Sequence, residues 1–318
     1  MGTQKSIVPE LSVVIPVYNE QGNLSVLDKE LKTALQGLRR SYEILYVNDG
    51  STDDSLGELK ALSGITIIEL NRNYGQATAL DAGFKAAEGD IVISLDADGQ
   101  NDPADISALL KKLEGEKLDV VAGWRKKRND NGNIRVITIA ARLLRRLFIG
   151  DIVHDSGCTL RVYRREAVKS LDIGGEMHRF ILALLKWKGF KIGEMVVNHR
   201  PRTIGVSKYG SSKALRGTID LIYIWFIHKY SQRPLHLFGY MSVAALALGT
   251  IAGLWAVYGK LFMGLSLNRN GWFFLTFFFL LAGVIFFSFG IVIDLLMQIR
   301  FSTSKNEQRY YVREVINT

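Results

Sequence analysis

The sequence predicts an α/β domain built on a parallel, doubly wound sheet, followed by a hairpin of two membrane-spanning helices. In the N-terminal part of the chain, short apolar runs alternate with helical patterns in regular order, as strands and helices do in such sheets. Nearer the C-terminal end lie two long runs without a charged residue. Each run is long enough for the roughly 20 residues that cross a hydrocarbon core.

The strands and helices of the α/β part are marked by the spacing of their apolar residues. The expected strands cover residues 11–17, 42–47, 65–70, 90–95 and 119–122, and the expected helices include 24–38 and 77–87. Ligands bind at the carboxyl ends of the strands in such a sheet. The residues that directly follow each strand are therefore the candidates for function.

The two uncharged runs, residues 237–259 and 270–293, are the expected membrane spans. A pair of buried core helices is the alternative, but residues 273–281 show no polar stripe that a helix could present to water. The link between the runs carries only Lys260 and Arg269, whereas several lysines and arginines lie on the outer flanks. By the positive-inside rule, both termini lie in the cytoplasm.

These features divide the chain into four parts. We expect a water-facing domain over residues 1–210, a membrane-proximal amphipathic helix over 211–233, the two spans within 234–298 and a cytoplasmic tail over 299–318. A further amphipathic segment, residues 134–148, sets apolar residues against arginines. Such segments suit a membrane surface, and packing on the α/β domain or on another copy of the chain is the alternative. A homo-oligomer thus stays open.

Composition narrows the class of protein further. The chain has 318 residues, 48% of them hydrophobic, and a formal net charge of +9. A basic surface suits phosphate-bearing substrates, anionic lipid headgroups or nucleic acid, but no nucleic-acid-binding motif is present. The single cysteine, Cys158, excludes an intramolecular disulfide and fits a reducing compartment. The N-terminal residues lack the apolar region of a signal peptide.

Polar residues follow the first two strands. The first strand leads into Pro16-Val17-Tyr18-Asn19-Glu20, and the second into Asn48-Asp49-Gly50-Ser51-Thr52-Asp53. The chain has neither the GxGxxG of dinucleotide-binding dehydrogenases nor the GxxxxGK[ST] of nucleoside triphosphatases, so both common nucleotide folds are disfavoured. Taken alone, Asp49 fits an ordinary Asp-Gly turn equally well.

The fourth strand ends in Asp96-Ala97-Asp98-Gly99-Gln100. Two carboxylates and an amide oxygen suit Mg²⁺ or Mn²⁺ held jointly with a diphosphate, because phosphates supply the remaining ligands. Such a pair of aspartates taken alone also fits an acidic loop.

Arginines follow the later strands. Gly123-Trp124-Arg125 comes after the fifth strand, and Arg161, Arg164 and Arg165 come after Asp155-Ser156-Gly157-Cys158. Guanidinium groups bind phosphate oxygens at two points. A solvated basic loop stays the alternative for Lys127 and Arg165.

Together, and with Arg161-Val162-Tyr163-Arg164-Arg165-Glu166 and Ser207-Lys208-Tyr209-Gly210, these motifs resemble the polyprenyl-phosphate glycosyltransferases of family 2. The resemblance extends from Leu11 to about Gln232 and includes the two-helix anchor. It is closer to the bacterial glucosyl branch of O-antigen modification than to the dolichol-phosphate mannose synthases.

The resemblance implies a GT-A fold and a set of site residues. It places Pro16, Tyr18, Glu20, Asp49 and Asp96 around the nucleotide sugar, and Asp96, Asp98 and Gln100 around Mg²⁺ or Mn²⁺. It makes Asp96, Asp98, Arg125, Asp155, Arg161 and Arg202 catalytic, and Arg202, Ser207 and Lys208 contacts of the acceptor phosphate. Asn48 departs from the pattern, since many relatives carry a second aspartate there, and leaves open how the base is recognised.

The implied reaction is an inverting transfer of glucose from UDP-glucose to undecaprenyl phosphate at the bacterial inner membrane. The chain lacks the QxxRW segment of processive synthases, which favours a single transfer. Transfer of mannose from GDP-mannose or of an aminosugar, and a nucleotide- or lipid-binding protein without catalysis, are the alternatives. For the segment 197–210, a basic hinge on lipid headgroups is the alternative to an acceptor loop.

Overall fold

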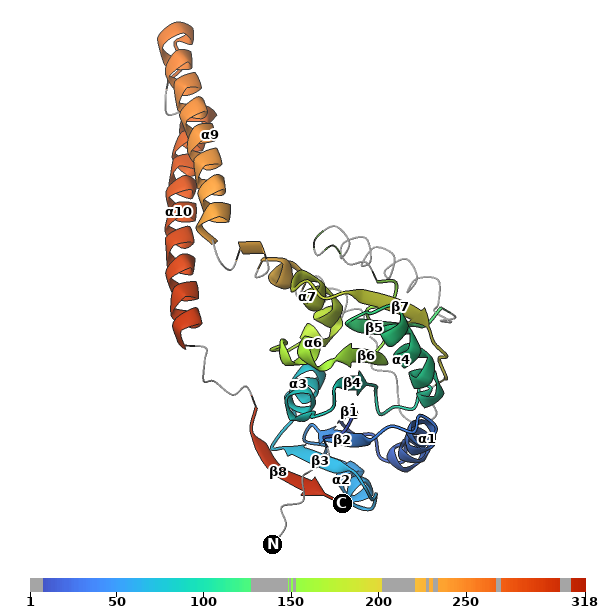
Figure 1. Ribbon diagram of the computed structural model, residues 1–318. Coiled ribbons are helices and arrows are strands. Elements are labelled where there is room, and N and C mark those ends of the chain that lie inside the picture. The colour runs from blue at the N-terminus through green and yellow to red at the C-terminus, as the bar shows by residue number, and fades with distance from the viewer. Residues whose placement is uncertain are drawn as a thin grey trace. The chain divides into compact units, whose positions relative to one another are not determined.

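A computed structural model describes residues 8–126, 148, 150, 153–201, 221–226, 229–230, 234–266, 270–303 and 310–318. The chain divides into two compact units. One comprises Met1–Thr218 and Gln308–Thr318, and the other is Ile219–Glu307. The first is an α/β unit and the second is helical (Figure 1).

An eight-stranded sheet forms the centre of the α/β unit, with the strand order β7-β5-β6-β4-β1-β2-β3-β8. Its strands are β1 (Leu11–Val17), β2 (Tyr42–Asn48), β3 (Thr66–Leu70), β4 (Ile91–Ser94), β5 (Val120–Trp124), β6 (Arg161–Arg164), β7 (Ile192–Val196) and β8 (Val312–Asn317). The helices are α1 (Leu24–Gln36), α2 (Ser55–Lys60), α3 (Gln76–Ala86), α4 (Ile106–Gly115), α6 (Arg165–Lys169) and α7 (Ile181–Trp187), with short 3₁₀ turns η1 (Pro103–Asp105) and η2 (Met177–Phe180).

The sheet buries both of its faces. Side chains of α1, α2 and α4 form one apolar core with alternate residues of the strands, and side chains of α3, α6 and α7 form the other. In β1, Val13 and Ile15 belong to the first core and Val14 to the second, because successive side chains of a strand point to opposite faces. This arrangement explains why the strands are apolar throughout rather than alternating.

The sheet is mixed rather than wholly parallel, which corrects the expectation from the sequence. Strands β1, β2, β3 and β4 pair in parallel, as do β5 and β7, whereas β6 runs antiparallel to β4 and β5, and β8 antiparallel to β3. After β5 the chain enters β6 from the same edge of the sheet, and this places Arg161, the first residue of β6, opposite Ser94 and Ala122. The antiparallel direction of β6 therefore brings Arg161 to the carboxyl edge.

The five expected strands and the two expected helices are present, with ends that differ by one or two residues. The sequence did not predict β6, β7 or β8. It assigned residues 299–318 to a separate tail, but α10 extends to Thr303 and β8 belongs to the sheet of the α/β unit. The expected amphipathic segments 134–148 and 211–233 lie largely outside the described residues.

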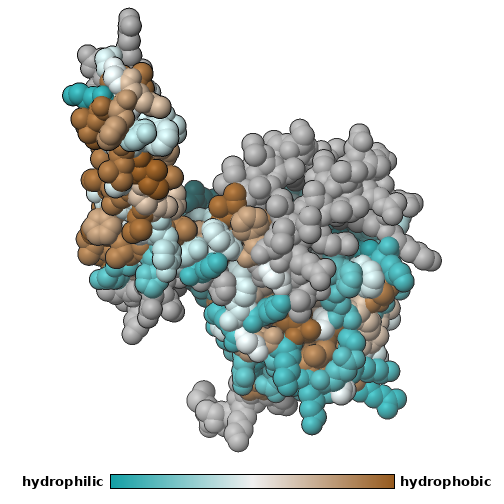
Figure 2. All heavy atoms as spheres, turned by 90° about the horizontal axis from the view of Figure 1, so that it is seen from above, coloured by the Kyte–Doolittle hydropathy of each residue, from teal (hydrophilic) through white to brown (hydrophobic). Residues whose placement is uncertain are grey.

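The helical unit contains two long helices, α9 (Pro234–Met263) and α10 (Gly271–Thr303). Both are long and apolar enough to cross a membrane, and only 22% and 11% of their most apolar windows are buried. Apolar side chains therefore cover their surface, in contrast to the largely hydrophilic α/β unit (Figure 2). Ser242 Oγ donates a hydrogen bond of 2.8 Å to the Gly283 carbonyl, which joins the two helices. Such a pair fits a transmembrane hairpin better than the core of a soluble protein.

Candidate active site

The loop after β1 carries the first group of predicted nucleotide contacts. Pro16 lies within β1, and Tyr18 and Glu20 follow it. The backbone N–H of Asn19 donates a hydrogen bond of 3.1 Å to Ser51 Oγ, so this loop is fixed to the loop after β2. The Tyr18 ring is 37% exposed, and an exposed aromatic face at this edge can stack on a nucleobase.

Asp49 holds the loop that follows β3. Its Oδ1 accepts a hydrogen bond of 2.7 Å from the Tyr74 N–H, and its Oδ2 accepts one of 2.8 Å from the Gly75 N–H. Burial raises the pKa of Asp49, and these two hydrogen bonds act against the rise. Asp49 is thus a loop-positioning residue as well as a turn residue, and its contact with the nucleotide stays a prediction.

Gly50 brings the loops after β2 and β3 into direct contact. Its φ is +63°, and a Cβ at this position would lie 2.4 Å from the carbonyl carbon of Arg72. A left-handed φ and so close a backbone both favour glycine. Next to it, Asn48 accepts a hydrogen bond of 3.2 Å from the Ser51 N–H, so the asparagine that departs from the family pattern stabilises the turn.

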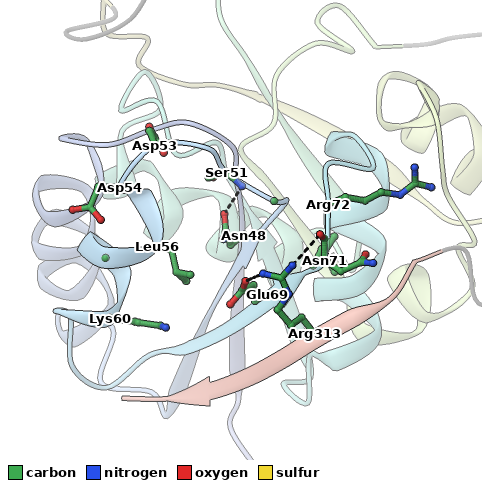
Figure 3. Close-up of a pocket in the computed structure, with 13 residues that line it drawn as sticks. Asn48, Ser51, Asp53, Asp54, Leu56, Lys60, Glu69, Asn71, Arg72 and Arg313 are labelled. Carbon is green, nitrogen blue, oxygen red and sulfur yellow. Dashed lines mark hydrogen bonds and ion pairs between the residues drawn. The ribbon is translucent and has the colours of Figure 1, made fainter.

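A pocket of about 460 Å³ opens beside these loops (Figure 3). It is formed by the carboxyl ends of β2 and β3, by α2 and by one arginine of β8. Its lining is polar on most sides and consists of Asn48, Gly50, Ser51, Asp53, Asp54, Leu56, Gly57, Lys60, Glu69, Leu70, Asn71, Arg72 and Arg313.

Asp96 and Asp98 lie together after β4. Burial and the charge of Asp98 raise the pKa of Asp96 to about 6, while Thr159, Arg125 and Arg161 act in the opposite direction. The repulsion between the two carboxylates favours a cation between them.

The donor set fits Mg²⁺ or Mn²⁺. In the described part of the chain no three acidic, histidine or cysteine side chains form a metal-binding group. Two carboxylates with the nearby Gln100 match a cation that takes its other ligands from a diphosphate. Asp98 Oδ1 accepts a hydrogen bond of 3.1 Å from the Gln100 N–H, which fixes the turn of this loop.

Gln76, the first residue of α3, holds Asp96 in place. Its Nε2 donates a hydrogen bond of 2.6 Å to Asp96 Oδ1. The sequence did not indicate this residue, although its place just after the Asn71-Arg72-Asn73-Tyr74-Gly75 segment, at the carboxyl edge of β3, is a signal that could have found it.

Arg125 and Asp155 form a two-point ion pair. Arg125 Nε lies 2.7 Å from Asp155 Oδ2, and Nη2 lies 3.0 Å from Oδ1. Burial lowers the pKa of Arg125, but the hydrogen bond and charge of Asp155 outweigh it and raise that pKa above its usual value. Asp155 therefore orients an arginine whose charge reaches Asp96.

Arg161 braces the segment between Asp155 and β6. Its Nε donates 2.7 Å to the Cys158 carbonyl and its Nη2 donates 2.6 Å to the Ser156 carbonyl. With 2% exposure, Arg161 is buried. Its charge lies close enough to Asp96 to oppose the rise in that residue's pKa, while two of its donors bind backbone carbonyls.

Two further residues, whose contacts the sequence did not indicate, hold loops of the site from β7 and from the residues after it. Glu194 accepts the His154 N–H at 2.6 Å and contacts His154 Nδ1 at 2.8 Å. The Arg200 N–H donates 2.9 Å to the Gln100 carbonyl, and its guanidinium contacts Glu30. Sequence patterns do not reveal such partners, because His154 and Glu194 are 40 residues apart in the chain and Glu30 and Arg200 are 170 residues apart. The predicted acceptor contacts Arg202, Ser207 and Lys208 lie outside the described residues.

Comparison with known proteins supports the family suggested by these motifs. A family model described as glycosyl transferase family 2 matches residues 12–172. The dodecaprenyl-phosphate galacturonate synthase of Rhizobium johnstonii is 34% identical over 316 residues, which cover 97% of this chain and 93% of that protein. The undecaprenyl-phosphate 4-deoxy-4-formamido-L-arabinose transferase of Klebsiella pneumoniae is 36% identical over 318 residues, covering 97% and 94%.

Among solved structures, the glucosyl-3-phosphoglycerate synthase of Mycobacterium tuberculosis superposes with a TM-score of 0.54 at 20% identity. The match covers 69% of this chain and 80% of that one. At this identity the likeness concerns the fold alone, and it confirms the GT-A type. With the matching family model and relatives that align over nearly the whole chain, the protein belongs to glycosyl transferase family 2.

Proposed function

We propose that this glycosyltransferase moves one sugar from a nucleotide sugar to a polyprenyl phosphate at the cytoplasmic face of the inner membrane. The observation that carries the proposal is the grouping of Asp96, Asp98 and the Asp155-held Arg125 at the carboxyl edge of the sheet. In the same chain, two apolar helices fit a membrane anchor. The relatives named for transfer to dodecaprenyl and undecaprenyl phosphate align over nearly the whole chain.

The acceptor itself supplies the nucleophile. A phosphate monoester has its second pKa near about 6, so its oxygen is already anionic at neutral pH. That oxygen forms the new bond to the anomeric carbon, while the bond from this carbon to the nucleoside diphosphate breaks, with inversion. Asp155 is engaged with Arg125, and the reaction does not need it as a base.

The protein's task is then to position the reactants and stabilise the leaving diphosphate. Asp96, Asp98 and Gln100 would hold the Mg²⁺ or Mn²⁺, which supplies positive charge to the diphosphate. Arg125 and the buried Arg161 add positive charge at the same edge, as their effect on the pKa of Asp96 indicates.

The relatives indicate which donor sugars to consider. The sequence suggested glucose from UDP-glucose, whereas the relatives are named for galacturonate and 4-deoxy-4-formamido-L-arabinose. We therefore place nucleotide-linked galacturonate and 4-deoxy-4-formamido-L-arabinose ahead of glucose from UDP-glucose, and mannose from GDP-mannose behind all three.

The proposed topology has both termini in the cytoplasm. Strand β8 pairs with β3, so the chain that leaves the α/β unit after Thr218 returns to it by Gln308. Two membrane crossings allow this return, and a single crossing would separate β8 from its sheet. This connectivity supports a hairpin of α9 and α10.

Donor competition tests the function. The purified chain in detergent would be given undecaprenyl phosphate with labelled UDP-galacturonate, UDP-linked 4-deoxy-4-formamido-L-arabinose, UDP-glucose or GDP-mannose, each with and without EDTA. Lipid-linked product from one donor, lost on EDTA addition, is the expected result. Donor binding without product from any of them would favour the non-catalytic alternative.

A further inference from the structure

We propose that the C-terminal strand β8 is part of the donor site, with Arg313 as a positioning residue for the donor loop, residues 71–76. The donor loop connects β3 to α3 and includes Gln76, the hydrogen-bond partner of Asp96. The proposal rests on the proposed function in assigning this loop to the donor, and on the contacts of β8 for the rest.

Arg313 occupies a β-bulge. The β3–β8 register pairs Glu69 with Glu314 and then Leu70 with Val312, so Arg313 is the extra residue of β8. Bulges next to active sites re-aim a side chain and interrupt the ladder locally. Here the bulge lies where β3 passes into the donor loop.

The re-aimed side chain makes two contacts at the start of the donor loop. Arg313 Nη1 lies 2.9 Å from Glu69 Oε1, and Nη2 donates 3.3 Å to the Asn71 carbonyl (Figure 3). The Asn71 N–H in turn donates 3.2 Å to the carbonyl of Tyr311, the residue just before β8. Both polar groups of the Asn71 backbone are thus held by β8 and the residue before it.

Glu69 makes the pair with Arg313 necessary. Its side chain is 8% exposed, whereas that of Arg313 is 60% exposed. A buried carboxylate needs a charged or hydrogen-bonding partner, and within the described residues Arg313 is the one that its side chain has. Loss of Arg313 would leave this charge unpaired directly beside the donor loop.

Hydrogen bonds along the donor loop connect the contacts of Arg313 with Asp96. Asn71 Oδ1 accepts a hydrogen bond of 2.8 Å from Tyr74 Oη. The N–H groups of Tyr74 and Gly75 donate to the carboxylate of Asp49. Gln76 follows directly and donates 2.6 Å to Asp96. A series of short contacts therefore connects β8 with the residue expected to hold the metal.

A matched pair of variants separates positioning from general support of the sheet. Arg313→Ala removes the contacts at the donor loop. Asn317→Ala removes the 2.9 Å hydrogen bond between Thr66 Oγ1 and Asn317 Oδ1, which joins the same two strands at their other end. Arg313→Lys keeps the charge and tests rescue.

The experiment uses the full chain in detergent and two measurements. Hydrogen–deuterium exchange reports on the donor loop without any ligand, and calorimetry reports on binding of UDP, and separately of GDP, with Mn²⁺. For Arg313→Ala we expect faster exchange over 71–76 and about tenfold weaker UDP binding, since small displacements of positioning groups have effects of this size or larger. Asn317→Ala should leave both near wild type, and Arg313→Lys should restore part of the loss.

Exchange over 71–76 that is unchanged in Arg313→Ala, or that rises equally in Asn317→Ala, would overturn the inference. UDP binding by Arg313→Ala that is as tight as binding by the wild-type chain would also overturn the inference. If the wild-type chain binds neither UDP nor GDP, the proposed function fails, and the exchange measurement still decides whether β8 positions the loop.

Discussion

The carboxylate of Asp155 binds the guanidinium of Arg125 through two hydrogen bonds, from Nε to Oδ2 at 2.7 Å and from Nη2 to Oδ1 at 3.0 Å. Both side chains are largely buried, at 13% and 15% exposure. A guanidinium held at two points cannot rotate away from the site, so its charge stays near Asp96, where we propose that the diphosphate binds.

Asp155→Ala should therefore reduce kcat/KM by about 10²-fold, because Arg125 loses its orientation. The free energy of unfolding should fall by about 2 kcal/mol, since a charged hydrogen-bond pair is broken in a mostly buried place. Asp155→Asn keeps one acceptor and should lose less. Steady-state kinetics with urea unfolding checks both, and an active Asp155→Ala enzyme would contradict the role.

Gln76 offers a test of how Asp96 is positioned. Gln76→Ala removes the 2.6 Å hydrogen bond to Asp96 Oδ1 and should raise the Mn²⁺ concentration for half-maximal activity by about tenfold. Gln76→Glu should be worse than Gln76→Ala, because it adds a third negative charge beside Asp96 and Asp98. The reverse order of the two variants would argue against direct support of Asp96.

The pKa of Asp96 predicts how metal binding depends on pH. Without metal, burial and Asp98 raise this pKa to about 6, so the carboxyl group is protonated below that pH and must lose its proton when a cation binds. Mn²⁺ affinity should thus be constant above about pH 7 and fall about tenfold per pH unit below 6. Calorimetric Mn²⁺ titrations from pH 5 to 8 in ~0.5-unit steps check this, and a flat profile would contradict it.

Gly50 tests the contact between the loops after β2 and β3. Gly50→Ala combines a left-handed φ with a Cβ placed 2.4 Å from the carbonyl carbon of Arg72, so stability should fall by more than the roughly 1–2 kcal/mol that the φ alone costs. Gly64→Ala is the matched control, since its φ is +68° and nothing lies within 4 Å of its Cβ. Equal losses in thermal or urea unfolding would show that the close approach does not matter.

The sequence predicted the parts of the fold that depend on local pattern. Strand β1 and helix α1 could be found because apolar residues recur at the spacing of each element. Strand β8, Val312–Asn317, was missed because it is a mostly exposed edge strand with Arg313 and Glu314 in its middle, which resembles a charged tail.

At the candidate site, too, the sequence predicted residue types and positions but not the contacts that depend on tertiary structure. Aspartates and arginines after the strands were indicated by residue type and position, and Asp96, Asp98 and Arg125 do lie near one another. The loop-holding uses of Asp49 and Arg161 could not be predicted, because their partners are backbone atoms whose positions follow from tertiary structure alone.

The most direct test of the central claim compares Asp98→Asn with Asp90→Asn in formation of lipid-linked sugar from undecaprenyl phosphate and the preferred nucleotide sugar. Asp90 lies just before β4, at the opposite end of that strand from Asp98, and its side chain is 80% exposed. We expect Asp98→Asn to lose at least about 10²-fold in product formation, because the charge that holds the cation on the diphosphate is removed, and Asp90→Asn to match wild type. Undiminished product formation by Asp98→Asn would contradict the metal-dependent transfer that the account places at this edge of the sheet.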